Sequence, residues 1–328
     1  MKKEQKLIFR LLPLLIAAVI AALLPQMIRN EYYMTIACQI LIYLIAVCGL
    51  NFITGMTGQM NLGTAGIFCL GAYTSALLTT RLGISPWLAM LAVIAMGLII
   101  GFGLGYPSLR LKGVYLSLTT IAFGEIVRQL VNNMTNVTGG AQGVRQIPFY
   151  NLFGFEINTR VRMYYFLLVG VVLFGFISWR IIHSKWGRVF FAVRDNIDAI
   201  DACGISSASV KIIAFTLAAV FGTIAGALYA HYSSYINPST FVLNLSVSFV
   251  VMVMIGGSGT LMGPILGAVI VSMLPEFLRF LGNYYQITYY VLVLLCTIFI
   301  PGGICNLSVF KKGQSVEKPA TPKNRGKE

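Results

Sequence analysis

Charged side chains are rare in the apolar segments of this 328-residue sequence, and the clearest exceptions are Glu125 and Arg128. They lie three residues apart in the apolar stretch 114–131, after Thr119 and Thr120, so on a helix they share a face and can pair. A carboxylate in apolar surroundings is costly unless it is paired or functional. Three interpretations follow: a structural ion pair, the lining of a polar cavity, or a proton carrier. The neighbouring arginine favours the ionised carboxylate, which argues against the proton carrier.

A second polar group lies in the segment 55–71, which contains five glycines together with amide and hydroxyl side chains. A polar group that faces lipid without a partner is costly. Such a segment is therefore expected to line a cavity or to interrupt its helix, as helices near translocation paths do. The candidate residues for a translocation path are Gly58, Gln59, Asn61, Gly63, Thr119, Thr120 and Glu125.

Glycines spaced four apart elsewhere in the chain have a simpler explanation. Gly97 and Gly101, for example, place small residues on one helix face, which lets two helix backbones approach closely. The run 256–259 is open to a second interpretation as well. Three glycines followed by Pro264 are also typical of a broken helix.

The third pattern predicts a short amphipathic helix over residues 189–204. Val193, Ile197 and Ile200 recur at helical spacing on one face, and Gly204 suits the C-terminal end of the helix. A helix this short is marginal in water by itself, and its three aspartates would oppose an anionic membrane surface. Docking to a partner protein is the favoured interpretation, and a helix lying on the bilayer is the alternative. The charged positions are Arg194, Asp195, Asp198 and Asp201.

The sequence contains none of the common catalytic motifs. There is no Gly-x-Ser-x-Gly, no His-Glu-x-x-His and no P-loop, since the one Gly-Lys pair, at 326–327, is followed by glutamate. The six cysteines form no Cys-x-x-Cys pair, and no histidine lies at metal-ligand spacing. The chain is therefore expected to be no enzyme and to hold no cofactor or metal of its own. If it transports actively, the energy must come from an ion gradient or from a separate ATPase.

Composition decides the broad class of protein. Of all residues 57% are hydrophobic and 10% charged, whereas soluble proteins carry roughly a quarter of their residues as charges. This excludes a soluble enzyme, a secreted domain and a disordered chain. The net charge of +14 would suit nucleic-acid binding, but the lysines and arginines lie mostly between apolar segments and in the C-terminal tail. Charge placed there sets membrane topology, so no nucleic-acid partner is expected.

Apolar segments of roughly the 20 residues needed to cross a bilayer recur along the chain. The expected fold class is therefore an all-α polytopic membrane protein with about ten transmembrane helices. The segments are 7–28, 32–53, 60–80, 86–106, 114–131, 163–182, 211–231, 244–258, 263–281 and 285–304.

Charge placement predicts the topology. If all ten segments cross, most of the 24 lysines and arginines fall on one side, which must be the cytoplasm and must hold both termini. The long loop 132–162 is then external, and the loop 183–210 is cytoplasmic. We expect one transmembrane permease domain over residues 1–310. Residues 311–328 are expected to form a disordered, basic cytoplasmic tail.

Several motifs point to a known family. They are Thr-Gly-Gln-Met-Asn-Leu-Gly at 57–63, Leu-Arg-Leu-Lys-Gly-Val-Tyr at 109–115, Thr-Ile-Ala-Phe-Gly-Glu-Ile-Val-Arg at 120–128 and Ser-Lys-Trp-Gly-Arg at 184–188. These stretches resemble the permeases of branched-chain amino acid ABC importers, and the resemblance covers residues 43–303. The second and third motifs resemble the LivM-type subunit in particular.

The resemblance implies a type II ABC importer fold and a multi-subunit assembly. The partners would be a related second permease subunit, two ABC ATPase subunits that bind the ATP, and an external amino-acid-binding protein. The amphipathic helix would be the coupling helix that contacts an ATPase. Asp198, Ala199 and Ile200, with Gly204 six residues after Asp198, resemble the Glu-Ala-Ala-x-x-x-Gly pattern of ABC importers, with Asp for Glu and Ile for the second Ala.

The expected function is that of a permease subunit that moves leucine, isoleucine and valine across the inner (plasma) membrane. Alternating access would be driven by the separate ATPase subunits. The alternative is an ion-coupled secondary transporter of small amino acids that acts alone. That alternative requires an intramembrane carboxylate that changes its protonation state, and the arginine beside Glu125 opposes this.

Overall fold

The structure, a computed structural model, describes residue 25 and residues 30–109, 111, 113–152, 155–299 and 302–306. Apart from Pro25, the expected first helix at 7–28 lies outside these residues, as does the tail from residue 311. The long helices are α2 (Glu31–Leu50), α3 (Thr64–Arg81), α4 (Pro86–Ser108), α5 (Val114–Asn133), α7 (Arg160–Ile182), α10 (Ser207–Ser233), α11 (Leu243–Gly256), α12 (Met262–Leu278) and α13 (Tyr285–Phe299).

Short elements connect the long helices. The short helices are the π-helix η1 (Asn51–Met56), α6 (Thr135–Thr138), α8 (Lys185–Asp195), α9 (Ile197–Ala202) and the 3-10 turns η2 (Gly140–Gln142), η3 (Pro238–Thr240), η4 (Arg279–Tyr284) and η5 (Ile304–Asn306). The strands are β1 (Val144–Arg145), β2 (Asn151–Leu152), β3 (Phe155–Glu156) and β4 (Tyr235–Ile236).

The all-α polytopic fold class is confirmed. Within the described part of the chain, each of the nine expected segments from 32–53 to 285–304 contains one long helix. Seven helical stretches of this part are long and apolar enough to cross a membrane, judged by length and composition. The α13 helix has only 15 residues. The expected segment 60–80 is helical only from Thr64, where α3 begins, because the residues before it form an irregular stretch.

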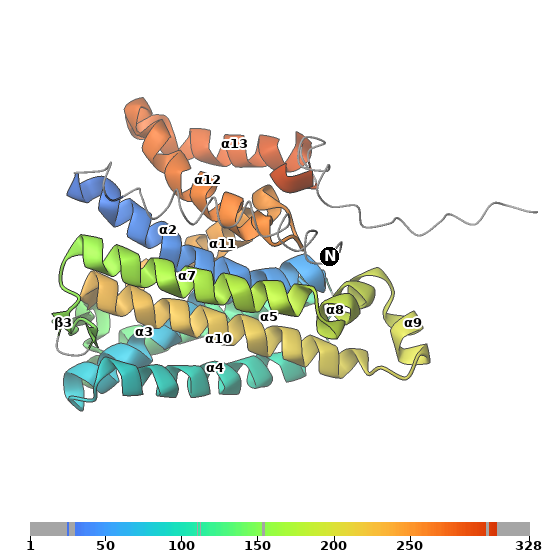
Figure 1. The fold of residues 1–328 in the computed structure, drawn as a ribbon, viewed down its shortest axis with the longest axis horizontal. Helices are drawn as coiled ribbons and strands as arrows, with labels where there is room; N and C mark the ends of the chain where they lie inside the picture. The colour runs from blue at the N-terminus through green and yellow to red at the C-terminus, as the bar shows by residue number, and fades with distance from the viewer. Residues whose placement is uncertain are drawn as a thin grey trace, which may run out of the picture.

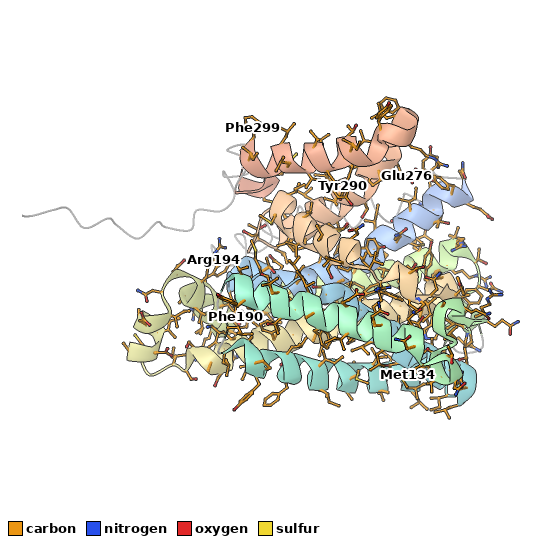
Figure 2. The ribbon with its side chains drawn as sticks, turned by 180° about the vertical axis from the view of Figure 1, so that it is seen from behind. Met134, Phe190, Arg194, Glu276, Tyr290 and Phe299 are labelled. Carbon is orange, nitrogen blue, oxygen red and sulfur yellow. The ribbon has the colours of Figure 1, made fainter. Side chains whose placement is uncertain are left out.

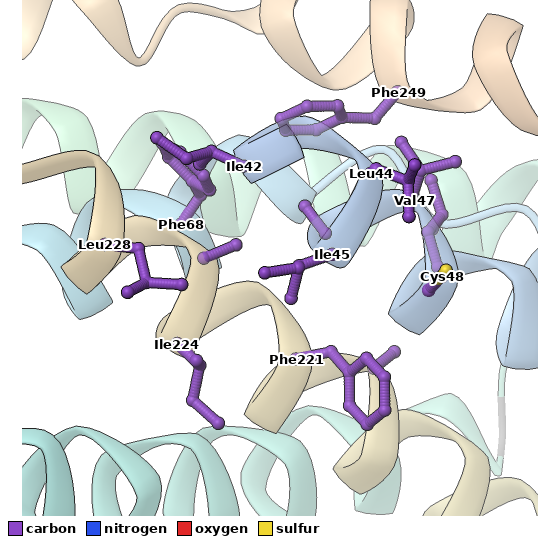
Figure 3. Packing of buried hydrophobic residues seen from close by; sticks show 14 of the residues in the cluster. Ile42, Leu44, Ile45, Val47, Cys48, Phe68, Phe221, Ile224, Leu228 and Phe249 are labelled. Carbon is purple, nitrogen blue, oxygen red and sulfur yellow. The ribbon is translucent and has the colours of Figure 1, made fainter. Parts of the chain in front are cut away.

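The apolar core forms around α2, which packs against α7, α10 and α12 (Figure 1). Ile45 of α2 is fully buried, close to Phe221 and Leu228 of α10 (Figure 3). Phe68 of α3 and Phe249 of α11 complete this centre, with ring centroids 5.8 Å apart. The nearly complete burial of α2 explains why its apolar residues cover all sides of the helix rather than one stripe.

The expected close helix packing occurs between α4 and α10. A Cβ atom on Gly101 would lie 2.4 Å from the Cα of Thr216, and one on Gly97 would lie 2.8 Å from the Cα of Val220. No side chain fits at either position. The glycines four residues apart therefore let the two backbones touch, as the spacing predicts.

The two long loops lie at opposite ends of the helical body (Figure 1). At one end, β1 of the loop 132–162 pairs antiparallel with β4, which follows α10. The same loop is tied to the core by His231 of α10, whose Nδ1 donates to the carbonyl oxygen of Pro148 at 2.6 Å while its Nε2 lies 2.7 Å from the Ser75 hydroxyl. At the other end, α8 and α9 form a small lobe. Figure 2 shows Arg194 in this lobe and Met134 at the far end.

Candidate functional site

The glycine-rich segment interrupts its helix, as its composition predicts. The helix α2 continues into the π-helix η1, and residues 57–63 then have no regular structure until α3 begins at Thr64. This irregular stretch lies along α5. The hydroxyl of Ser117 donates to the carbonyl oxygen of Met60 at 3.5 Å, and the backbone N–H of Leu62 donates to the hydroxyl of Thr120 at 3.1 Å.

Polar groups are left over where this stretch enters α3. The side-chain oxygen of Asn61 accepts from the backbone N–H of Gly63 at 2.8 Å. Its amide nitrogen and the hydroxyl of Thr64 have no hydrogen-bond partner among the described residues, although both residues are buried. The first turns of α3 and α11 meet here, because the backbone N–H of Ala65 donates to the hydroxyl of Ser246 at 2.8 Å. The N-termini of α3 and α11, both positive dipole ends, thus meet beside Thr64.

The two glycines at the start of α3 allow this close approach to α5. A Cβ on Gly63 would lie 2.6 Å from the carbonyl oxygen of Thr120, and one on Gly66 would lie 2.7 Å from the Cα of Gly124. Asn61, Gly63 and Thr120 are therefore brought together. Gly58 lies apart from them, against the side chain of Arg194. Gln59 is half-buried, and its buried side-chain oxygen has no hydrogen-bond partner among the described residues.

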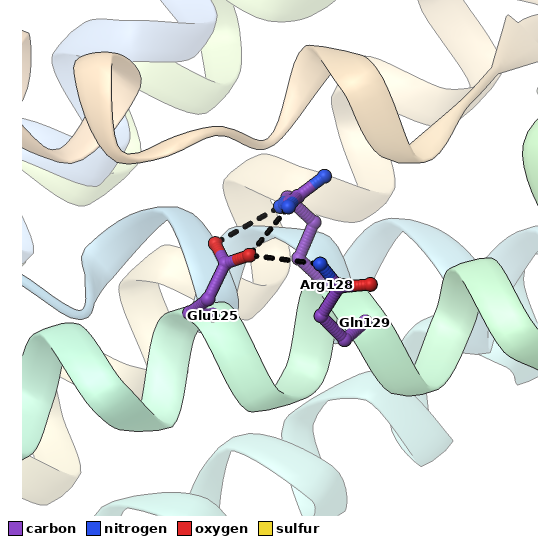
Figure 4. A network of polar contacts seen from close by, with 3 residues as sticks. All are labelled: Glu125, Arg128 and Gln129. Carbon is purple, nitrogen blue, oxygen red and sulfur yellow. Dashed lines mark hydrogen bonds and ion pairs between the residues drawn. The ribbon is translucent and has the colours of Figure 1, made fainter.

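The remaining path candidates lie on the outer face of α5. Glu125 forms the expected ion pair with Arg128 and also accepts a hydrogen bond from Gln129 at 3.1 Å (Figure 4). The side chain of Glu125 is 47% exposed and that of Arg128 is 23% exposed. Thr119 is exposed as well, with its hydroxyl bonded to the backbone of Tyr115. The outer face of α5 thus exposes an ion pair and two further polar side chains beside the apolar residues Leu118, Ile126 and Leu130.

The expected single helix over 189–204 is wrong, because the structure has two helices, α8 and α9. Asn196 separates them with an extended backbone (φ −157°) and caps α9 by accepting from the backbone N–H of Ala199 at 3.1 Å. Asparagine is one of the preferred N-cap residues, because its side chain can replace a backbone acceptor at the start of a helix. The apolar residues therefore keep their helical spacing along the sequence although the backbone is interrupted at Asn196. Gly204 ends α9 in the left-handed conformation (φ +78°), as predicted.

The charged residues of this lobe have separate roles. The guanidinium of Arg194 donates to the carbonyl oxygen of Gly55 at 2.7 Å, and among the described residues no ion pair joins it to Asp198, four residues along the chain. Asp201 accepts from the backbone N–H and the hydroxyl of Ser207, both at 2.9 Å, and these hydrogen bonds lower the pKa of its carboxyl. Charged positions on both helices of the lobe are exposed, among them Arg194, Asp195, Asp198 and Asp201, and Ala199 is exposed beside them.

Comparison with known proteins decides the family. A family model described as the permease component of branched-chain amino acid transport systems matches residues 32–301. The chain belongs to this family. It is therefore a permease subunit of an ABC importer and a multi-pass protein of the inner membrane, and it is not itself an enzyme.

The individual relatives agree with this assignment. The chain is 32% identical over 313 residues to the high-affinity branched-chain amino acid transport system permease protein LivM of Escherichia coli K12, which covers 88% of this chain and 74% of that protein. It is 33% identical over 309 residues to LivM of Salmonella typhimurium LT2, covering 87% and 72%. These identities confirm the LivM type. The fructose import permease protein FrcC of Rhizobium meliloti is 27% identical over 256 residues, covering 75% and 70%. No solved structure matches the chain.

One polar residue of the permease is missing from the sequence-based candidates. Asn51 was included in the apolar segment 32–53, yet its buried amide joins the start of η1 to the turn between α11 and α12. It accepts from the backbone N–H of Gly259 at 2.9 Å and donates to the carbonyl oxygen of Thr260 at 3.0 Å. The available signal was an asparagine at membrane depth four residues before a glycine. Its partners lie more than 200 residues away, so sequence spacing does not identify them.

Proposed function

We propose that this permease imports branched-chain amino acids by alternating access. In this proposal it pairs with a related second permease subunit, is driven by two ATPase subunits that bind ATP, and receives its substrate from an external amino-acid-binding protein. The family and the LivM relatives support this substrate class, since branched-chain amino acids are named for them. The name of FrcC connects that relative with fructose instead, so substrate identity requires its own measurement.

The observation that carries the proposal is the exposed ion pair on the outer face of α5. Glu125, Gln129 and Thr119 lie on the outside of this chain, where lipid cannot accommodate an ion pair with its hydrogen-bonding neighbours. A second permease subunit and a water-filled path between the two subunits would cover this face. An ion pair that stays ionised suits a path lining better than a proton relay.

The break between η1 and α3 supports substrate contact on the same path. The free amide nitrogen of Asn61 and the hydroxyl of Thr64 are hydrogen-bond donors, and they lie where the N-termini of α3 and α11 meet. This combination suits a carboxylate group, because donors and helix dipoles both favour negative charge. The apolar helices around it suit a branched aliphatic side chain.

The lobe formed by α8 and α9 supports contact with an ATPase. Asp198 and Ala199 are exposed in α9, on the end of the molecule opposite the loop 132–162. An exposed, charged helix of six residues gains little stability from this chain alone. A motor protein that binds α9 can therefore shift it at low cost.

Purification and transport assays test the proposal. The chain with an affinity tag is expressed together with its partner subunits, and the purified complex is reconstituted with the binding protein. We expect ATPase subunits to co-purify and leucine uptake to require ATP. Asp198→Lys is expected to remove the ATPase subunits, whereas Glu31→Lys, a charge reversal at the far end, should retain them. Leucine accumulation by the chain alone in a proton gradient would contradict the proposal and favour a secondary transporter.

A further inference from the structure

A chain of close contacts connects the cytoplasmic lobe to the turn between α11 and α12. The first contact is the hydrogen bond from Arg194 of α8 to the carbonyl oxygen of Gly55, at 2.7 Å. Gly55 lies in the last turn of η1, where carbonyl oxygens lack partners within their own helix. The guanidinium therefore supplies both a donor and a positive charge to the C-terminal end of the helix formed by α2 and η1.

The second contact passes from η1 to the α11–α12 turn. Asn51, at the start of η1, holds the N–H of Gly259 and the carbonyl of Thr260 with the two ends of its amide. Its side chain also folds over Gly55, since a Cβ on Gly55 would lie 2.0 Å from the Asn51 oxygen. Asn51 and Gly55 are thus one packed unit, and a movement of either one displaces the other.

The α11–α12 turn is packed tightly against both α8 and η1. Gly257 (φ +124°) and Gly259 (φ +79°) both adopt backbone conformations that favour glycine. A Cβ on Gly259 would lie 2.8 Å from the ring of Phe191 and 3.1 Å from the carbonyl oxygen of Gly55. The residue is therefore packed between α8 and η1, so the turn contacts the lobe directly as well as through Arg194.

We propose that Arg194 and Asn51 are positioning residues that transmit movement of the cytoplasmic lobe to the α11–α12 turn, with the π-helix η1 as the connecting element. This inference rests on the proposed function, because it assigns a route to the force that an ATPase exerts on the lobe. It also gives Arg194 a role different from ATPase contact. Although the residue is exposed, its guanidinium is held by the Gly55 carbonyl, and the exposed residues of α9 are left for the partner.

The physical basis is the stiffness of the contacts. A charge-assisted hydrogen bond and a two-point amide contact both have narrow geometric limits. Glycines at the contact points leave no flexible side chain to absorb a displacement. A π-helical turn is a wider and less regular element than an α-helix and is frequent at functional positions. The contacts on both sides of η1 can therefore pass a displacement of the lobe on to the turn.

The test uses the reconstituted complex of both permease subunits, the ATPase subunits and the binding protein. Arg194→Ala and Asn51→Ala are each expected to keep the co-purified ATPase subunits and the basal ATPase rate. Leucine uptake and the stimulation of ATPase by the binding protein, both measured per assembled complex, should fall about tenfold. Arg194→Lys should restore most of the uptake, since a lysine can still donate to the Gly55 carbonyl. The double variant should have the same uptake rate as the single variant with the lower uptake rate, because the two residues act in series.

Arg188→Ala is the matched control, because it removes the same charge from an exposed position of α8 and should leave uptake unchanged. Uptake near the wild-type rate in Arg194→Ala overturns the relay, as does an additive loss in the double variant. Loss of the ATPase subunits in Arg194→Ala also overturns it, because Arg194 would then be a partner contact. A wild-type complex that does not form overturns the proposed function itself, and that outcome is distinct from the others. If Arg194→Ala yields little protein, the same uptake and ATPase measurements are made on Arg194→Gln, whose side chain keeps a neutral hydrogen-bond donor.

Discussion

The guanidinium of Arg194 caps the carbonyl oxygen of Gly55 at 2.7 Å across 139 residues of sequence. This contact joins the two regions for which the sequence suggests separate functions, the glycine-rich segment and the lobe formed by α8 and α9. It places a positive charge at the C-terminal end of a helix, where the helix dipole favours it. The permease thus has a direct connection between the surface proposed for a motor and the break in the helix proposed for the path.

Gly58→Ala tests this junction through packing. Gly58 has φ +70°, and a Cβ there would lie 3.1 Å from the Cγ of Arg194. We expect the backbone strain to cost roughly 1 kcal/mol and the displaced arginine to lower stimulated ATPase activity. Thermal unfolding of the purified permease and ATPase assays of the complex measure the two effects.

Gly83→Ala is the control for strain, because Gly83 has φ +62° but nothing lies within 4 Å of a Cβ there. It should show a similar loss of thermal stability with normal ATPase stimulation. Equal ATPase stimulation in both variants would show that the contact between Gly58 and Arg194 has no part in coupling.

Glu125→Gln tests the ion pair on α5. Removing the charge leaves Arg128 without its partner, so we expect less uptake or less protein in the membrane. The dependence of leucine uptake on pH should keep its shape, since a paired glutamate stays ionised. Glu276→Gln breaks a second ion pair spaced three residues apart, between Glu276 and Arg279 at 3.8 Å, and should have a smaller effect because the Arg279 side chain is 71% exposed. A shifted pH profile in Glu125→Gln would support the proton carrier instead.

Gly101→Ala tests the contact between α4 and α10. The new methyl group would lie 2.4 Å from the Cα of Thr216, so the helices must separate. Overpacking of this kind costs about 1–3 kcal/mol. Gly103→Ala, two residues along the same helix, meets nothing within 4 Å and should leave stability unchanged or raise it by about 1 kcal/mol. Thermal unfolding in one detergent compares the pair, and equal melting temperatures would refute the close packing.

Asp201→Ala tests the junction between α9 and α10. The variant loses both hydrogen bonds from Ser207, so the start of α10 should exchange its amide hydrogens faster. The hydrogen bonds lower the pKa of the Asp201 carboxyl in the folded state, so its contribution is complete above the usual pKa of 3.8 and is lost as the pH falls through the lower folded value. Between pH 6 and pH 8 the Asp201 carboxylate therefore stays ionised, and the protection of the α10 amides that it provides in the wild type should stay constant. Unchanged exchange in Asp201→Ala would mean that the cap contributes nothing.

The sequence by itself determined the membrane class, the positions of the nine long helices among the described residues, and the family. Long apolar segments have few alternatives in a bilayer, because every backbone polar group must be paired within a helix. Local chemistry was equally informative: the Glu125–Arg128 pair, the close approach at Gly101 and the end of α9 at Gly204 all follow from spacing within a few residues.

Only the tertiary structure decided which distant groups meet. Arg194 and Asp198 lie four residues apart, but the guanidinium reaches the carbonyl oxygen of Gly55 instead, because Asn196 breaks the helix between the two charged residues. The apolar pattern did not distinguish Asn51 from its neighbours, since its partners are backbone groups of a turn formed by glycines far along the chain. Hydrophobic periodicity records which faces are buried, whereas a hydrogen bond between remote segments depends on how the helices pack.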